Sequence, residues 1–303
     1  MAKFIISTDT CADLPKSFYE ENGIQYIILK RILKEQEISE CFDKPEEFDA
    51  FYDNIKKGDL PTTVQLNPFE LKEYFEGILE KEKEGDIIHI SLSSGLSTTC
   101  INAQSAAEEV NKDLEKAKNK RRVHVVDSLI ATLGMGQMII KLMELRDSGT
   151  DTKKALEKIL HYRDRQQGWV IMTDLFHLRR GGRISGAKAA LGTVLNLRPI
   201  IHLSKKGKLP MENKMRGNIK AVKYILARME KYGEKFDKDF ATQTVWVVRT
   251  SNSDLYDLLK RSIISTYPNL TIREGIVGPI IGTHLGCGGV CVLWEGAPRL
   301  DID

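Results

Sequence analysis

The chain of 303 residues is 42% hydrophobic and 29% charged, so it has the composition of an ordinary globular protein that is long enough for two hydrophobic cores. Its 45 basic and 42 acidic residues leave a net charge of +3, and this balance gives no support to nucleic-acid binding. The five cysteines show no Cys-x-x-Cys spacing, so they indicate neither a disulfide framework nor a structural zinc site.

The first half of the chain alternates between strand-like and helix-like segments. The N-terminal residues enter a strand at Phe4 without the apolar core of a signal peptide, and no segment reads as a transmembrane span, so we expect a cytoplasmic protein. Strands that alternate with helices favour a mainly parallel, Rossmann-like sheet with ligands beyond the carboxyl ends of its strands. The expected strands cover residues 4–7, 24–29, 87–92 and 122–126, and the expected helices cover 16–22, 48–56, 69–83, 100–118, 129–145 and 152–165.

Hydroxyl residues cluster where the third of these strands ends. The apolar run 87–92 is followed by Ser93, Ser94, Gly95 and further serines and threonines before a helix begins at Cys100. Such a turn brings together backbone N–H groups, hydroxyl donors and the positive end of a helix dipole, so its natural ligand is a small anion. We take this anion to be a carboxylate. The alternative is that one of the serines only caps the helix.

A further hydroxyl lies on an extended loop. Pro61 and Pro68 restrict the residues between them to extended backbone, so Thr63 can face a ligand, although a loop threonine can also be merely solvated. Because Thr63 and the Ser93 turn both follow strand-like segments, the geometry of a parallel sheet allows them to converge on one crevice.

The second half of the chain predicts a separate α/β domain with a mixed sheet and helices. We place the boundary near Gln167, which gives an N-terminal domain of residues 1–167 with the hydroxyl turns and a C-terminal domain of residues 168–303. The expected strands cover 169–172, 199–203, 244–249, 271–277 and a terminal strand that ends near 294, a hairpin turn covers 205–208, and the expected helices cover 214–231 and 254–266.

Three features of this second domain are candidates for function. Arg183 belongs to a group of arginines around a glycine pair, and Lys214 and Arg216 open an expected helix at the end where cations oppose the dipole. His284 lies in an expected irregular turn rich in glycine, just before the terminal strand. Each has an ordinary alternative, namely a solvated basic face or a structural histidine. Small residues at 186–192 leave space beside a helix, or else allow close packing, and the side chains that can line such a space include Leu191, Val194 and Leu195.

The chain resembles the DegV family of bacterial fatty-acid-binding proteins, and the likeness runs from Thr8 to Trp294. The order and spacing of several motifs carry it. These motifs are Thr8-Asp9-Thr10 with Asp13-Leu14-Pro15, Thr63 with Gln65 and Pro68, Ser91-Leu92-Ser93-Ser94-Gly95-Leu96-Ser97, Val126-Asp127-Ser128, Leu178-Arg179-Arg180-Gly181-Gly182-Arg183-Ile184-Ser185, and Gly282-Thr283-His284-Leu285-Gly286.

The resemblance implies a long-chain fatty acid in a tunnel between two α/β domains, with no other cofactor and no metal. It implies Thr63, Ser93 and Ser94 as carboxyl ligands, with the Gly95 amide and His284 nearby. It also implies a carrier subunit without catalytic activity of its own, which presents the carboxyl group to a separate ATP-dependent fatty acid kinase. Among the basic residues, those that the resemblance offers for docking this kinase are Arg183, Lys214 and Arg216.

The chain departs from the family pattern at several positions, and other functions fit less well. Val64 and Leu66 replace the usual serine and proline, and Cys287 replaces a usual proline, which affects the expected chain-length preference and carboxyl geometry. Binding of another amphiphilic carboxylate is one alternative. A serine hydrolase built on Ser93 or Ser94 with His284 lacks the Gly-x-Ser-x-Gly elbow, a nucleic-acid-binding protein lacks aromatic stacking residues, and a kinase lacks a P-loop pattern.

Overall fold

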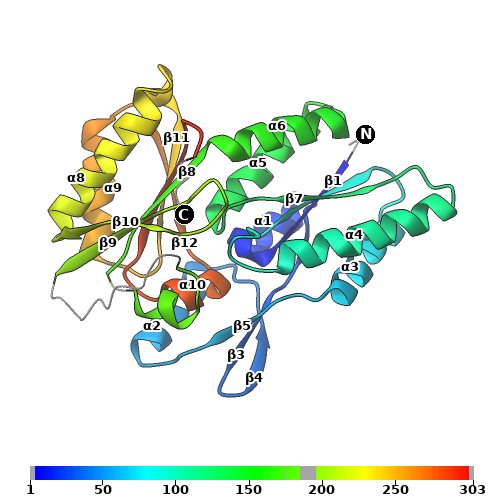
Figure 1. Cartoon of the computed structure of the whole chain (residues 1–303), viewed down its shortest axis with the longest axis horizontal. Coiled ribbons are helices and arrows are strands. Elements are labelled where there is room, and N and C mark those ends of the chain that lie inside the picture. The colour runs from blue at the N-terminus through cyan, green and yellow to red at the C-terminus, as the bar shows by residue number, and fades with distance from the viewer. Residues whose placement is uncertain (1–3, 174, 185–195, 300–303) are drawn as a thin grey trace. The chain divides into compact units, whose positions relative to one another are not determined.

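The computed structural model describes residues 4–173, 175–184 and 196–299 and divides the chain into two compact units (Figure 1). Unit 1 consists of Met1–Lys44 and Pro61–Arg163, and unit 2 consists of Pro45–Leu60 and Asp164–Asp303. The sequence predicted a single boundary between residues 1–167 and 168–303, and it did not predict that Pro45–Leu60 belongs to the second unit.

Unit 1 contains a parallel four-stranded sheet of order β2-β1-β6-β7 and a small antiparallel sheet of order β4-β3-β5. Strand β6 is apolar and buried from Ile87 to Ile90, as expected for a parallel strand that is covered on both faces. Helix α4 packs on β7 and α3, while α5 packs on β1 and β6. The elements of unit 1 are β1 (Phe4–Asp9), η1 (Thr10–Ala12), α1 (Lys16–Glu21), β2 (Gln25–Ile27), β3 (Lys30–Leu33), β4 (Gln36–Ser39), β5 (Thr62–Val64), α3 (Pro68–Lys81), β6 (Asp86–Ser91), α4 (Thr99–Lys116), β7 (Val123–Asp127), α5 (Leu133–Asp147) and α6 (Thr152–Arg165), the last of which runs on into unit 2.

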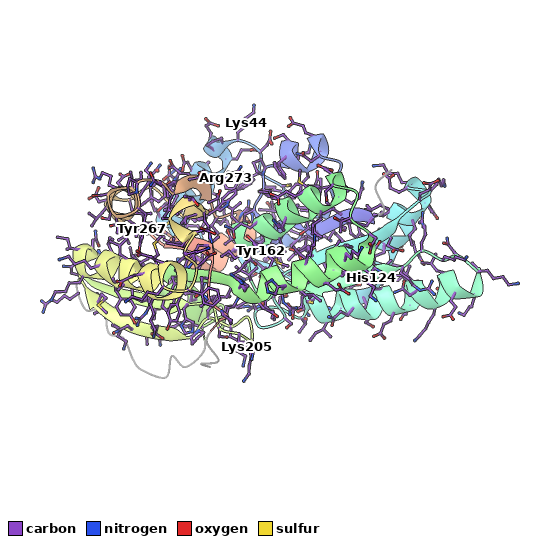
Figure 2. The ribbon with its side chains drawn as sticks, turned by 90° about the horizontal axis from the view of Figure 1, so that it is seen from above. Lys44, His124, Tyr162, Lys205, Tyr267 and Arg273 are labelled. Atoms are coloured by element: carbon purple, nitrogen blue, oxygen red, sulfur yellow. The ribbon has the colours of Figure 1, made fainter. Side chains whose placement is uncertain are left out.

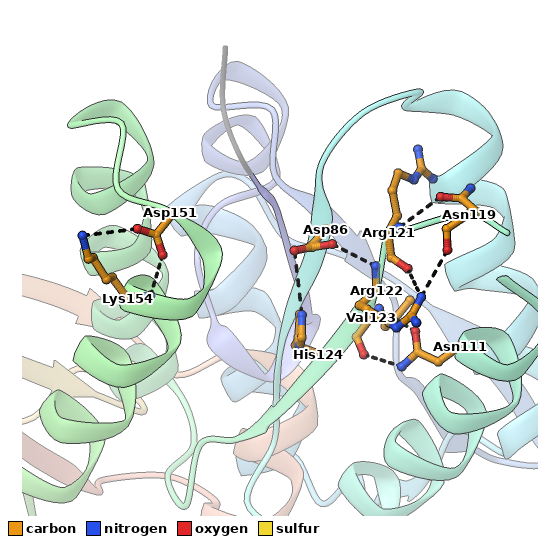
Figure 3. Close-up of polar contacts among 9 residues, drawn as sticks. All are labelled: Asp86, Asn111, Asn119, Arg121, Arg122, Val123, His124, Asp151 and Lys154. Carbon is orange, nitrogen blue, oxygen red and sulfur yellow. Dashed lines mark hydrogen bonds and ion pairs between the residues drawn. The ribbon is translucent and has the colours of Figure 1, made fainter. Parts of the chain in front are cut away.

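Side chains fix the register of β7 at the edge of the parallel sheet where its strands begin (Figure 3). Asn111 bonds both backbone groups of Val123, with its Nδ2 2.9 Å from the carbonyl oxygen and its Oδ1 2.8 Å from the amide nitrogen. Asp86 accepts the backbone N–H of Arg122 at 2.8 Å. These bonds set the strand so that its far end, at Asp127, reaches the candidate site.

Unit 2 contains a mixed six-stranded sheet of order β10-β9-β8-β13-β11-β12, in which β11 and β12 are parallel and the other pairs are antiparallel. Its core includes the fully buried Trp169, Trp294 and Phe240. Tyr267 and Arg273, labelled in Figure 2, belong to this unit, and the Arg273 guanidinium lies 5.6 Å from the ring centre of Trp246. The elements of unit 2 are α2 (Pro45–Lys56), β8 (Gln166–Ile171), α7 (Phe176–Arg180), β9 (Leu197–His202), β10 (Met211–Arg216), α8 (Asn218–Met229), η2 (Glu230–Glu234), η3 (Phe240–Thr242), β11 (Thr244–Arg249), α9 (Asp254–Thr266), β12 (Thr271–Ile276), α10 (Pro279–Leu285) and β13 (Val290–Glu295).

Helix α2 packs on the C-terminal part of unit 2 by its aromatic face. The Tyr52 hydroxyl donates to the carbonyl oxygen of Val277 at 2.8 Å, and Arg249 pairs with Asp49 at 3.1 Å. Gly282 lies so close that a Cβ atom there would stand 2.5 Å from the Tyr52 hydroxyl oxygen. This contact explains why a segment before residue 61 belongs to the second unit.

The structure corrects two local expectations that bear on function. Lys214 and Arg216 lie on β10, which pairs antiparallel with β9, and not at the start of a helix. The helix begins at Asn218, so neither Lys214 nor Arg216 lies in its first turn, and that argument for their function falls away. His284 lies in helix α10 instead of an irregular turn, because Pro279 starts the helix and Gly286 ends it with φ +70°.

Two further expectations differ in detail. The helix expected over 129–145 begins at Leu133, and the residues before it form a loop. The hairpin of β3 and β4 was not expected from the sequence, since its turn at Lys34 and Glu35 adopts positive φ without the usual glycine or asparagine. No helix in the described part of the chain is both long enough and apolar enough to span a membrane.

Candidate functional site

The first candidate group is the turn between β6 and α4, which lies in unit 1. Ser93 is fully buried, and its backbone N–H donates to the carbonyl of Ile130 at 3.1 Å. Its carbonyl accepts from Leu96 and Ser97, which closes the turn tightly. The strand ends here because the backbone N–H groups that follow find partners in the turn and not in the sheet.

The hydroxyl groups of this turn differ in their roles. The Ser93 hydroxyl accepts the N–H of Gly95 at 3.1 Å, so the amide that the resemblance implies as a carboxyl ligand already has an intramolecular partner. The Ser97 hydroxyl accepts the N–H of Thr99, also two residues further on, at 3.1 Å. Ser94 is exposed. The Ser93 and Ser97 hydroxyls thus each stabilise the turn, and none of these serines is the N-cap of α4, which is Thr98.

Two carboxylates hold the turn in place, and both come from neighbouring strands. Asp9 at the end of β1 is fully buried and accepts the N–H of Leu92 at 2.8 Å. Burial raises the pKa of Asp9 more than the hydrogen bonds that it accepts lower it, so the pKa is about 6. Asp127 at the end of β7 accepts the N–H groups of Ser94 and Leu129, each at 3.1 Å, through the same oxygen.

Thr63 lies on β5, opposite Arg31 of β3 in an antiparallel pair, and is partly buried. The loop that follows β5 is joined to the start of α4. Asn102 donates to the carbonyl of Leu66 at 2.7 Å, and the Thr98 hydroxyl donates to the side chain of Gln65. Within unit 1, these bonds connect the segment that carries Thr63 with the helix that follows the serine turn.

A separate candidate residue is His284, which lies in unit 2. It packs against the end of α7, where a Cβ atom on Gly181 would stand 2.3 Å from the histidine Nδ1. Burial, together with the nearby Arg183, Arg180 and His177, lowers the pKa of His284 to about 4. The imidazole is therefore neutral near pH 7, and it would meet a carboxylate as a hydrogen-bond donor and not as a cation.

This leaves the residues expected to line the acyl tunnel and those expected to dock the kinase. Leu191, Val194 and Leu195 lie outside the described residues. Arg183 donates to the carbonyl of Gly181, close to His284, whereas Arg216 on β10 is exposed and Lys214 is partly buried. No cluster of three or more histidine, cysteine, aspartate or glutamate side chains suited to a metal occurs among the residues that the structure describes.

Sequence reasoning named the serines and missed the groups that hold them. Asp9 and Asp127 act on residues more than thirty positions away in the chain, so no local pattern marks them as anchors of the turn. Two signals were available, since each stands just after an expected parallel strand, where site residues collect, and each belongs to a motif that carries the family resemblance.

A family model described as "Uncharacterised protein, DegV family" matches residues 3–296. The chain belongs to the DegV family. A DegV domain-containing protein of Clostridium perfringens is 30% identical over 297 residues, which is 98% of each chain. One of Streptococcus pyogenes serotype M3 is 32% identical over 298 residues, which cover 97% of this chain and 98% of the relative.

Solved structures of DegV proteins share the fold over almost the whole chain. DegV of Bacillus subtilis, described as a fatty acid binding protein, is 27% identical with a TM-score of 0.78, and the match covers 98% of this chain and 100% of that one. The fatty acid kinase (Fak) B3 protein of Streptococcus pneumoniae, loaded with linoleic acid, is 20% identical with a TM-score of 0.77 and coverage of 97% and 99%. The mixed and parallel sheets described above are thus those of the DegV fold.

Proposed function

We propose that this DegV protein binds a long-chain fatty acid and presents its carboxyl group to a separate ATP-dependent kinase. The observation that carries the proposal is the hydroxyl turn after β6, since Ser93 and Ser94 stand at the carboxyl edge of a parallel sheet and neither is the N-cap of α4. Membership of the DegV family supports a fatty acid as the ligand, because the 27% identical relative from Bacillus subtilis is described as a fatty acid binding protein.

In this proposal Thr63, Ser93, Ser94 and His284 donate hydrogen bonds to the carboxylate, and the apolar tail supplies most of the affinity. A saturated chain of about 16 carbons, buried at about 0.8 kcal/mol per methylene, contributes on the order of 12 kcal/mol before the costs of binding. Hydroxyl groups and a neutral imidazole suffice to orient a single carboxylate. The protein then acts as a carrier, and the kinase supplies the chemistry of phosphoryl transfer.

Mass spectrometry of the purified protein tests the proposal directly. The native protein is expected to carry one equivalent of a fatty acid, and organic extraction is expected to release it and identify its length. The substitutions Ser93→Ala and Thr63→Val should each weaken the uptake of oleate by the delipidated protein about tenfold, as expected for the loss of a hydrogen bond to a charged group. A protein that is isolated empty and takes up neither oleate nor palmitate contradicts the proposal and favours another amphiphilic carboxylate.

The kinase is proposed to dock on the basic residues Arg183, Lys214 and Arg216 of unit 2. Arg216 offers the cleanest test, because its side chain is exposed on β10. Arg216→Ala is expected to leave oleate binding within about twofold and to lower the rate of acyl phosphate formation with a fatty acid kinase about tenfold, as for the loss of one charged contact. Lys223→Ala, at another exposed basic residue on α8, serves as the control. Loss of oleate binding in Arg216→Ala would contradict this division of roles.

A further inference from the structure

Thr132 has a backbone conformation that its side chain opposes. It stands at the end of the loop after β7, immediately before α5, with φ 52° and ψ −149°. This region is essentially confined to glycine, and a β-branched residue in it is an outlier that the surroundings must enforce. Glycine would fit the backbone better, so the threonine side chain is retained despite the strain.

The hydroxyl of Thr132 has no hydrogen-bond partner among the described residues, although the residue is only 7% exposed. Buried hydroxyl groups in folded proteins are nearly always hydrogen-bonded, and those without a partner require an explanation. Ser128 in the same loop shows the ordinary case, because its buried hydroxyl donates to the carbonyl of Ile130 at 2.9 Å. Thr132 caps nothing either, since its side chain makes no bond to the first turn of α5.

The loop that carries Thr132 is joined to the serine turn. The N–H of Ser128 donates to the carbonyl of Ser91, and the N–H of Ser93 donates to the carbonyl of Ile130, both at 3.1 Å. Thr132 follows Ile130 by two residues and immediately precedes the 15-residue helix α5, whose positive dipole end favours an anion. A buried donor without a partner therefore lies beside the turn that we propose to hold a carboxylate.

We propose that Thr132 is a further carboxyl ligand of this site, whose hydroxyl donates to the carboxylate that Ser93 binds. The inference rests on the proposed function, because it takes the fatty acid carboxylate as the missing partner. It also explains the strain, since the substitution to glycine that would relieve the backbone would remove the donor.

The test compares Thr132→Val, which keeps the shape and removes the hydroxyl, with Thr132→Ser, which keeps the hydroxyl. Oleate affinity of the delipidated protein is expected to fall about tenfold in Thr132→Val and to stay within about twofold of the wild type in Thr132→Ser. Oleyl alcohol, which has the same tail and no charge, should lose much less affinity. The ligand-free Thr132→Val protein should unfold at the same temperature as the wild type or a higher one, because an unpartnered buried hydroxyl has been removed.

Several outcomes overturn the inference. One is a Thr132→Val protein that binds oleate as the wild type does. Another is equal loss of oleate and oleyl alcohol together with a lower unfolding temperature, which would assign Thr132 a structural role. Thr132→Gly provides a second variant that relieves the strain, and it should be stable and lose oleate affinity to the same degree as Thr132→Val. Failure of the wild type to bind oleate would instead refute the proposed function itself, which is a separate result.

Discussion

Two glycines give the histidines of unit 2 the space that they occupy. A side chain at Gly181 would collide with the imidazole of His284, and one at Gly286, where φ is +70°, would stand 2.3 Å from the ring of His177. Both neighbours are rings held in packed surroundings, so neither can move aside at low cost. The position of His284 therefore depends on the lack of a side chain at Gly181 as well as on α10, the helix that carries it.

Gly181→Ala is expected to displace His284 and to weaken oleate binding severalfold, about as much as the loss of one hydrogen bond. Gly182→Ala is the matched control, since a Cβ atom there meets nothing within 4 Å, although its φ of +67° makes the substitution strained. The control should lose about 1 kcal/mol of stability and keep its affinity. Isothermal titration of both variants measures the difference, and equal affinities would show that His284 does not bind the ligand.

His89 lies fully buried on β6 with its Nδ1 2.9 Å from the Ser7 hydroxyl, and burial lowers its pKa to about 3. Below the ordinary pKa of a histidine, the unfolded chain binds a proton at His89 and the folded chain does not. The free energy of unfolding therefore decreases as the pH falls. The expected loss between pH 7 and pH 5 is about 2 kcal/mol. Asp9 gives the opposite slope, because its raised pKa favours the folded state as the pH falls.

Replacing His89 by asparagine should remove about 2 kcal/mol of pH dependence between pH 5 and pH 7. Urea unfolding at both pH values measures it, and the difference between the two cancels any fixed cost of the smaller side chain. If the variant shows the same dependence as the wild type, the buried histidine is not the group that takes up the proton on unfolding.

At the scale of elements, the turn after β6 and the loop after β7 are linked, because Asp127 accepts a backbone N–H from each. Asp127→Ala is expected to free both segments and to lower oleate affinity roughly fivefold to tenfold through the loss of the two bonds. Asp127→Asn retains the accepting oxygen and should remain within about twofold of the wild type, since a neutral acceptor can replace the carboxylate. Hydrogen exchange of the Ser94 and Leu129 amides provides the accompanying structural measurement, and unchanged exchange in Asp127→Ala would contradict this coupling.

The strongly patterned elements could be predicted from the sequence, and the weakly patterned ones could not. The apolar run 87–90 and the hydroxyl cluster at Ser93 predicted a buried strand and its polar turn, which the structure contains. Strand β10 was misread because Met211–Arg216 is charged and only partly buried, so it lacks the apolar alternation of an ordinary strand. The glycines around His284 suggested a turn, but Gly282 lies in helix α10 and allows that helix to pack closely against Tyr52.

At the scale of the molecule, the chain passes from unit 1 to unit 2, returns, and passes to unit 2 again. Local pattern predicted that residues 48–56 form a helix, and they lie within α2. The local sequence pattern could not predict which part of the chain this helix packs against, because Tyr52 and Val277 are far apart in the sequence. The same limit applies to Thr63 and His284, which belong to different units and whose joint action remains a proposal.

Tyr52→Phe removes one hydroxyl and should raise hydrogen exchange in residues 277–287, with a loss of about 1 kcal/mol in stability. Exchange in β6 and β7 should stay as in the wild type, because those strands belong to unit 1. Mass spectrometry of peptic fragments measures both regions in one experiment. Faster exchange confined to residues 45–60 would show that α2 does not stabilise the C-terminal part of its unit.

The path of the chain also governs the order in which the protein can fold during its synthesis. Helix α2 leaves the ribosome early with an aromatic face formed by Phe48, Phe51 and Tyr52, which is buried in the finished protein. The residues that contact this helix, from Arg249 to Cys287, are made about two hundred positions later. At a synthesis rate of roughly 5 to 20 residues per second, this aromatic face therefore lacks its packing partner for on the order of ten seconds or more. Slowing translation after residue 60 should thus favour aggregation of the nascent chain, and coexpression of a chaperone that binds apolar segments should counteract it.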